Sequence, residues 1–160
     1  MATEEVLYWP GFFGYMGVAS ALIFANAGAA YGTARSGNGL AGMAITNPSA
    51  AIKNIIPIIM AGILGIYGLI VAVILLGQIK SPSEGYSANM GFAHLAAGLS
   101  CGLSSLGAGF AIGIAGDYGV RAVGRQPKVY VGLILILIFA EAIGLFGLIV
   151  ALVISTSVTK

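Results

Sequence analysis

Residues 60 to 72 read MAGILGIYGLIVA, and residues 139 to 151 read FAEAIGLFGLIVA. Both stretches keep two glycines three positions apart and close on the same five letters, GLIVA, as two copies of one apolar helix would. They differ in character at one place, where Glu141 in the second stretch matches Gly62 in the first. The expected fold and the candidate site both follow from this pair of segments.

The apolar character of these stretches extends over most of the chain. Of 160 residues, 59% are hydrophobic and 8% are charged, whereas charged residues make up about a quarter of an average soluble domain. The charges delimit four runs, each longer than the ~20 residues that a helix needs to cross a bilayer, and only Glu141 interrupts one of them. The pattern predicts an all-α membrane protein with four transmembrane helices, at about residues 9–34, 54–79, 87–116 and 128–156.

An internal repeat relates the two halves of the chain. An offset of 79 residues places GAAYG at 28 on GAGFA at 107, Pro48 on Pro127 and the first GLIVA on the second, without a gap. The sequence therefore predicts a duplicated helical hairpin, the first copy over 1–80 and the second over 81–160. Both copies cross the membrane twice and have the same orientation, which favours assembly into an oligomeric ring.

Small residues recur in steps of three or four along all four predicted helices. The first helix has Gly14, Gly17, Ala21, Ala25, Gly28 and Gly32, and the third has Gly98, Gly102, Ser105, Gly109, Gly113 and Gly116. Shorter sets follow the second and fourth helices, at Ala61, Gly65, Gly68 and Ala72 and at Ala140, Gly144, Gly147 and Ala151. Lipid supplies no hydrophobic drive between helices, so these stripes are expected to let the helices pack closely.

Prolines and an asparagine mark the expected starts of two helices. Asn54 is predicted to cap the second helix with Pro57 in its first turn, and Pro127 is predicted to stand at the entry to the fourth. Gly, Asn, Pro and polar residues predict that the three connections are loops, at 35–53, 80–86 and 117–128.

Five of the seven basic residues fall in or beside the first and third loops: Arg35, Lys53, Arg121, Arg125 and Lys128. The other side carries Glu4, Glu5, Lys80, Glu84 and Lys160. By the positive-inside tendency, the first and third loops are expected in the cytosol, with both termini and the middle loop in the lumen.

Glu141 is the residue that indicates function. A carboxylate in mid-membrane costs roughly 3 kcal/mol, and apart from Lys128 at the first position of the fourth span, no Lys or Arg lies inside the four predicted spans to neutralise it. The protonated acid is then the cheaper state in lipid, and the charged state requires water or an outside cation. A group with these two states is expected to carry a proton.

The alternative is that Glu141 only hydrogen-bonds a neighbouring helix, through Asn26, Ser104, Ser105 or Tyr67. Among these, Tyr67 could orient a protonated carboxyl. A proton is favoured over sodium as the ion, because sodium needs several oxygen ligands and the residues around Gly62 supply none.

Composition excludes several other classes. A net charge of +2 without a basic stripe argues against nucleic acid. A single cysteine, Cys101, a single histidine, His94, and the absence of a CxxC motif argue against disulfides, metal sites and redox cofactors. His94 is interpreted as an interfacial or packed histidine, with a proton-relay role as the minor alternative. Asn26 and the helix 3 serines are interpreted as interhelical hydrogen-bond groups, and Asp117 with Arg121 as a surface pair or docking feature. The N-terminus lacks signal-peptide features, so the first helix is expected to stay.

With these features in place, the chain resembles the c-type proteolipids of the eukaryotic vacuolar-type proton ATPases. Four segments carry the resemblance: GAAYGTA at 28–34, PIIMAGILGIYGLIVAV at 57–73, GAGFAIGIAGDYGVR at 107–121 and LILILIFAEAIGLFGLIVAL at 133–152. The resemblance implies a multi-copy rotor ring with the first and third helices inside and the second and fourth outside. Glu141 then matches the proton-binding carboxylate of the family.

The same resemblance implies partner subunits and a cellular compartment. A large stator subunit would bring an intramembrane arginine to each carboxylate in turn, and a central stalk would seat on the loops from Arg35 to Lys53 and from Asp117 to Lys128. ATP would be hydrolysed in a separate sector, since this chain has no P-loop, so the chain is not expected to be catalytic alone. The ring would acidify a vacuole or another endomembrane compartment, in contact with membrane lipid.

Three rival interpretations remain at the level of sequence. A channel-forming or structural proteolipid could line its pore with Glu141. A secondary transporter is disfavoured, because no predicted span is broken around a polar site. A related proteolipid isoform of the same ring is the third.

Overall fold

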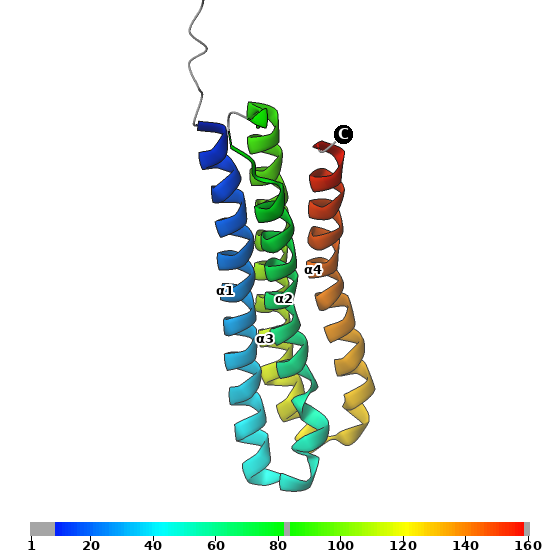
Figure 1. The fold of residues 1–160 in the computed structure, drawn as a ribbon. Coiled ribbons are helices and arrows are strands. Elements are labelled where there is room, and N and C mark those ends of the chain that lie inside the picture. Colours follow the sequence, from blue (N-terminus) through cyan, green and yellow to red (C-terminus); the bar gives the residue numbers. More distant parts are fainter. Residues whose placement is uncertain (1–8, 82–83, 159–160) are drawn as a thin grey trace, which may run out of the picture.

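The structure, a computed structural model of the chain, describes residues 9–81 and 84–158. Within these ranges there are four long helices and no strand: α1 (Trp9–Thr46), α2 (Ile56–Gln78), α3 (Ala88–Arg125) and α4 (Tyr130–Val158). Each is long and apolar enough to cross a membrane. The helices run side by side, and α1 begins at the end of the bundle where α4 ends (Figure 1). The predicted four-helix membrane fold is confirmed, while Glu4, Glu5 and Lys160 lie outside the described residues.

Small residues bring α1 and α3 into backbone contact. A Cβ added at Gly28 would stand 2.6 Å from the carbonyl oxygen of Ser105 and 2.7 Å from the Cα of Leu106. One added at Gly98 would collide with the backbone of Gly17. The stripes of α1 and α3 therefore face each other, and we call this contact the glycine seam; on both sides it is formed largely by main-chain atoms.

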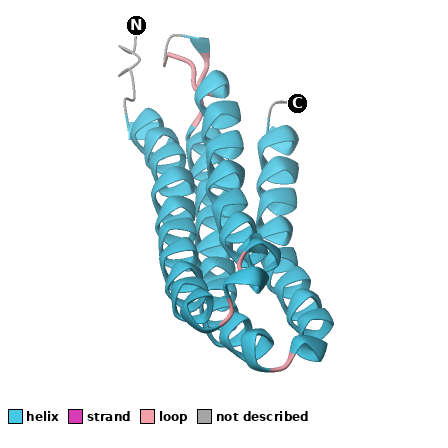
Figure 2. Cartoon of the chain, turned by 90° about the horizontal axis from the view of Figure 1, so that it is seen from below, coloured by secondary structure: helices cyan, strands magenta, loops and turns pink. Residues whose placement is uncertain are grey.

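The helices form two layers, and this contact lies within the first of them. α1 packs along α3 in one layer, α2 packs on α1 and α4 packs on α3, while α2 and α4 meet each other over a much shorter stretch. Short connections join the helices (Figure 2). Leu64, Ile112 and Leu137 are fully buried between the layers, whereas Phe139 and Phe146 of α4 are 74% and 65% exposed. The outer face of α4 is thus apolar and open, as a lipid-facing surface must be.

The predicted ends of two helices were wrong. α1 continues to Thr46 rather than ending near 34, and α3 continues to Arg125 rather than ending near 116. The segments predicted as the first and third loops are therefore largely helical. Packing overrides the low helix propensity of the glycines here: Ser36, Gly39 and Met43 are buried, and a Cβ at Gly39 would stand 2.6 Å from the Cα of Asp117.

The connections that the structure shows are short and contain turns of 3₁₀ helix. Two 3₁₀ turns, η1 (Pro48–Ala50) and η2 (Ile52–Ile55), lead into α2, and η4 (Pro127–Val129) leads into α4. Pro57 stands in the first turn of α2 and Pro127 opens the entry to α4, as predicted. The predicted cap was wrong: Ile55 precedes α2, and Asn54 is buried with its Nδ2 donating to the carbonyl oxygen of Ala50, 2.9 Å away.

Candidate functional site

Glu141 of α4 lies beside Tyr67 of α2. The phenol of Tyr67 donates a hydrogen bond to Oε1 of Glu141 over 3.0 Å, and both side chains are partly buried. Among the described residues, no Lys or Arg forms an ion pair with this carboxyl. The carboxyl is therefore oriented by one neutral hydroxyl.

The position of Glu141 along the bundle can be placed from its neighbours. Pro57 and Ser36 both pack against Gly116, at the level where the charged residues Arg35 and Asp117 begin. Tyr67 lies ten residues further along α2, which is ~15 Å of helix. That distance is about half of the ~30 Å hydrocarbon thickness, so Glu141 sits near the middle of the expected span.

Close packing of α4 on α2 and α3 fixes the backbone around the carboxyl. A Cβ at Gly144, one turn after Glu141, would stand 2.7 Å from a methyl of Leu64 and 3.5 Å from the Cβ of Ala108. At Gly147, a Cβ would stand 2.7 Å from the carbonyl oxygen of Ser100. Ser104 of α3 donates a hydrogen bond to the carbonyl oxygen of Ile143 in α4, so the predicted interhelical role of Ser104 is confirmed.

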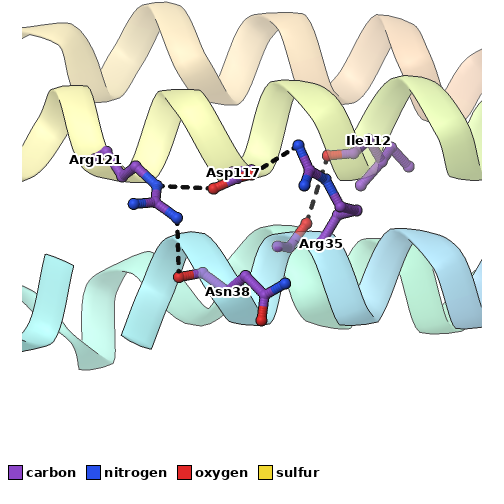
Figure 3. A network of polar contacts seen from close by, with 6 residues as sticks. Arg35, Asn38, Ile112, Asp117 and Arg121 are labelled. Carbon is purple, nitrogen blue, oxygen red and sulfur yellow. Dashed lines mark hydrogen bonds and ion pairs between the residues drawn. The ribbon is translucent and has the colours of Figure 1, made fainter. Parts of the chain in front are cut away.

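A second polar centre lies at the end of the bundle that carries η1, η2 and η4, which we call the basic end. Asp117 of α3 accepts from Arg35 of α1 over 3.0 Å and from Arg121 over 2.8 Å, and Arg121 also reaches the carbonyl oxygen of Asn38 (Figure 3). The Asp117 carboxylate is 6% exposed, and the arginine side chains are 38% and 50% exposed. The predicted Asp117–Arg121 pair exists within α3, one turn apart, with its carboxylate buried rather than at the surface, and the ion pair that bridges α1 and α3 is made by Arg35.

This placement corrects the predicted loop positions of the basic residues. Arg35 lies within α1, and Arg121 and Arg125 lie within α3. Of the five basic residues at this end, Lys53 and Lys128 lie in connections, in η2 and η4. Because α1 and α3 stay helical along their packed glycine stripes, the three arginines lie on helices and not in loops.

Comparisons with known proteins bear directly on this arrangement. The family of ATP synthase C-subunits matches the chain twice, over residues 16–75 and 95–154, in the register of the internal repeat. The chain is 58% identical over 157 residues to the V-type proton ATPase 16 kDa proteolipid of Ascaris suum, and the match covers 98% of both chains. The chain belongs to the family of V-type proton ATPase proteolipids.

Other V-type proton ATPase proteolipids are similarly close in sequence. One such 16 kDa proteolipid of Caenorhabditis elegans is 60% identical, with 96% of this chain and 95% of that protein covered. The corresponding proteolipid of Rattus norvegicus is 55% identical, with 92% and 94% covered. The double match of the family also confirms that the chain is a duplicated hairpin.

In this chain, the two copies of the hairpin differ at the site itself. Gly62 is the counterpart of Glu141 in the repeat. It lies on an exposed face of α2, and a Cβ added there would meet no atom within 4 Å. The first copy therefore lacks a carboxyl although its backbone leaves room for one.

His94 is packed at the end of the bundle opposite the basic end. It is fully buried, and its Nδ1 lies 2.7 Å from the hydroxyl of Tyr86. The interpretation of His94 as a packed histidine is confirmed. Burial raises the pKa of the Tyr86 phenol, which keeps the phenol neutral and able to hold this bond.

Proposed function

We propose that this chain is a rotor subunit of the membrane sector of a V-type proton ATPase and that Glu141 carries the proton. Membership of the family supports the first part. The observation that carries the second part is the position of Glu141: a half-buried carboxyl at mid-span, hydrogen-bonded by Tyr67 and paired with no cation among the described residues. The bond to Tyr67 by itself would also suit a structural carboxyl, which is the alternative that the experiment below must exclude.

The chemistry required of Glu141 is a cycle of two states. The carboxyl takes a proton where water from one side of the membrane reaches it, and it crosses the lipid-facing part of each turn as the neutral acid. It loses the proton where a cation stabilises the carboxylate, and we propose that a stator arginine supplies that charge. The Tyr67 hydroxyl orients the carboxyl by donating to its Oε1.

The two-layer packing fits a ring of such chains. We propose that the layer of α1 and α3 faces the centre of the ring and that α2 and α4, with Glu141, face outward. The basic end, formed by Arg35, Lys53, Arg121, Arg125 and Lys128, lies in the cytosol and seats a central stalk. The start of α1 and the end of α4 then face the lumen of a vacuolar or other endomembrane compartment.

A proton is the ion that the side chains around Glu141 favour. Sodium requires several oxygen ligands at once. In the part of the chain that the structure describes, Glu141 has one side-chain hydrogen bond, from Tyr67. Leu64 of α2, which packs against Gly144 one turn after Glu141, offers no oxygen ligand. The chain binds no nucleotide through a P-loop, so ATP hydrolysis belongs to other subunits.

The missing carboxyl at Gly62 has a consequence for energetics. A ring with one carboxyl per four helices moves about half as many protons per turn as one with a carboxyl on every hairpin. Each charge moved against 100 mV costs ~2.3 kcal/mol, so fewer protons per ATP allow a steeper gradient. We propose that this ratio suits acidification of a compartment.

The test combines chemical labelling with pumping. A hydrophobic carbodiimide reacts with protonated carboxyls in apolar surroundings, so mass mapping of treated membranes should find the label on Glu141 together with loss of ATP-driven acidification. Glu141→Gln should abolish both, while Glu84→Gln, an exposed glutamate outside the spans, should leave both unchanged. An unlabelled Glu141 with intact acidification would mean that the carboxyl is structural. A passive leak in Glu141→Gln membranes would favour the channel interpretation.

A further inference from the structure

The contact between the two hairpins uses one face of each and leaves the opposite face of each open. Within the chain, Tyr67 of the first hairpin bonds Glu141 of the second. Because the hairpins are copies, the offset of 79 residues carries Tyr67 onto Phe146, which is 65% exposed, and carries Gly62 onto Glu141. Phe146 and Gly62 thus mark the two open faces, which we call the free faces of α3–α4 and of α1–α2. The contact inside the chain is a template for what each free face can bind.

The free face of α1–α2 has a groove where the template has an aromatic ring. Tyr67 lies between two residues one turn apart on α4: its hydroxyl bonds Glu141, and its Cδ2 would lie 3.7 Å from a Cβ at Gly144. The matching residues of α2 are Gly62 and Gly65. Both line an open groove of about 340 Å³ between α1 and α2. This groove therefore fits an aromatic ring that reaches it from a helix like α4.

The chemistry of the two positions is matched as well. In the template, a phenol donor meets a carboxyl. On the free faces both polar groups are absent, because Phe146 stands in place of the tyrosine and Gly62 in place of the glutamate. A Cβ at Gly62 would meet no atom within 4 Å, so the chain itself leaves the space for a ring. A contact of Phe146 with Gly62 would bury no unsatisfied donor or acceptor.

A second pair of positions, at the basic end, is matched in size. Within the chain, Met43 of α1 packs on Gly124 of α3, and a Cβ at Gly124 would stand 3.6 Å from the Cβ of Met43. The offset carries this pair onto Ala122 of α3 and Ile45 of α1, so the large and the small member change sides. Ile45 is 84% exposed, and Ala122 lines an apolar groove of about 370 Å³ between α3 and α4. The side chain on one free face thus has a groove on the other.

We propose that a second copy of this chain docks on these free faces in the register of the internal repeat. Phe146 of one copy lies between Gly62 and Gly65 of the next, and Ile45 of that next copy enters the groove at Ala122 of the first. The contact joins two different faces, so each added copy presents a new free face, and the series closes into a ring where the rotation permits. This inference rests on the ring of the proposed function and names the side chains that join its neighbouring copies.

A disulfide can test the register at the basic end. Disulfides form where Cβ atoms are about 3.5–4.5 Å apart, and the template places the matching Cβ atoms within that range. In a chain with Cys101→Ala, the pair Ile45→Cys and Ala122→Cys should cross-link neighbouring copies in oxidised membranes, giving a ladder of multimers on non-reducing gels. Two chains that each carry one of these cysteines, when expressed together, should give dimers and no ladder. The masses of the bands identify copies of this chain.

Two control pairs accompany this measurement. Ile52 is 85% exposed at the same end of the bundle, but its counterpart Val131 is 67% exposed and therefore takes little part in the template contact. Ile52→Cys with Ala122→Cys should give at least about tenfold less multimer, since the disulfide geometry is absent. Met43→Cys with Gly124→Cys should form a disulfide within one chain and no multimers.

The position of Phe146 has a test of its own. Assemblies of the full chain are purified in mild detergent and warmed, and native mass spectrometry measures the fraction of free chain. Phe146→Ala should raise that fraction at least about tenfold, because a packed aromatic ring is lost from each contact. The control is Ile138→Ala on the same helix, since Ile138 and its counterpart Ile59 are 51% and 54% exposed. That variant should leave the fraction unchanged.

Each outcome decides the proposal. A ladder from Ile45→Cys with Ala122→Cys but not from the control pair, together with release of chains by Phe146→Ala, supports it. A multi-copy assembly in native mass spectrometry without that ladder would overturn the register and leave the ring of the proposed function standing. An unassembled chain would overturn both. Equal cross-linking of the two cysteine pairs, or an assembly that Phe146→Ala does not weaken, would overturn the contact concerned.

Discussion

The glycine seam makes a quantitative prediction for Gly109→Ala. A Cβ at Gly109 would stand 2.6 Å from the Cα of Gly28 and closer still to its carbonyl group, whereas carbon atoms pack at about 3.5–4.0 Å. α1 and α3 must then move apart by about 1 Å, since the obstructing atoms are main chain and cannot rotate away. Overpacking of this kind costs about 1–3 kcal/mol, and the rigid contact places Gly109→Ala in the upper half of that range.

The matched control is Gly107→Ala on the same helix. A Cβ at Gly107 meets no atom within 4 Å. Both variants gain the same helix propensity, about 0.5–1 kcal/mol for replacing glycine by alanine, so this gain cancels in the comparison. Gly109→Ala should therefore be less stable than Gly107→Ala by about 2–3 kcal/mol, which is roughly a 30- to 150-fold change in the ratio of folded to unfolded chain.

The chain supplies its own probe for this measurement. Trp9 is its single tryptophan, and its ring lies 5.7 Å from that of Phe92 across the α1–α3 contact. Denaturant titration of the chain in detergent micelles, followed by tryptophan fluorescence, reports the separation of these helices. If Gly109→Ala proves as stable as Gly107→Ala, the backbone contact described for the seam is wrong.

Four further predictions concern the site and the two ends. Tyr67→Phe removes one hydrogen bond to Glu141, about 0.5–1.5 kcal/mol, and should slow ATP-driven acidification by up to roughly tenfold with the ring intact; unchanged pumping would exclude the hydroxyl from the cycle. Gly62→Glu should fold, since its Cβ meets no neighbour, but should stall the ring or change the proton-to-ATP ratio; a normal ratio would contradict the coupling argument. Asp117→Asn leaves two half-exposed arginines unpaired and should lower the free energy of unfolding by about 1–2 kcal/mol, less at high salt, as thermal melts at two salt concentrations would show. The raised pKa of Tyr86 means that its neutral form stabilises the fold fully below the ordinary value of about 10 and less as pH rises toward the raised one; an alkaline titration of stability should lose that dependence in Tyr86→Phe.

The sequence predicted the features that depend on period and composition. Charge spacing located the four helices, and the match of GLIVA at 68–72 with GLIVA at 147–151 located the repeat. The stripes of small residues predicted which faces pack, because steps of three and four place them along one side of a helix. Glu141 stood out because a carboxyl in an apolar run is costly at any position in the fold.

Predictions from the sequence were wrong or incomplete where tertiary contacts determine the local structure. Glycines and asparagines after Arg35 predicted a loop, yet Ser36 and Gly39 continue the spacing of Gly28 and Gly32, and that continuation was the signal for a longer helix. The ion pair of Arg35 with Asp117 joins residues far apart in the chain, so spacing within one helix revealed only the Asp117–Arg121 pair. Asn54 had the residue type of a cap, but its amide bonds back to Ala50.

The glycine seam also constrains biosynthesis. It joins residues about eighty positions apart, such as Gly17 and Gly98, so the first hairpin enters the bilayer before its partner surface has been synthesised. During that interval its glycine face lies against lipid acyl chains, which pack poorly on bare backbone. Insertion of α3 ends this exposure, and a ribosome that stalls between residues 80 and 120 would leave a hairpin that a membrane quality-control protease can recognise by the same face.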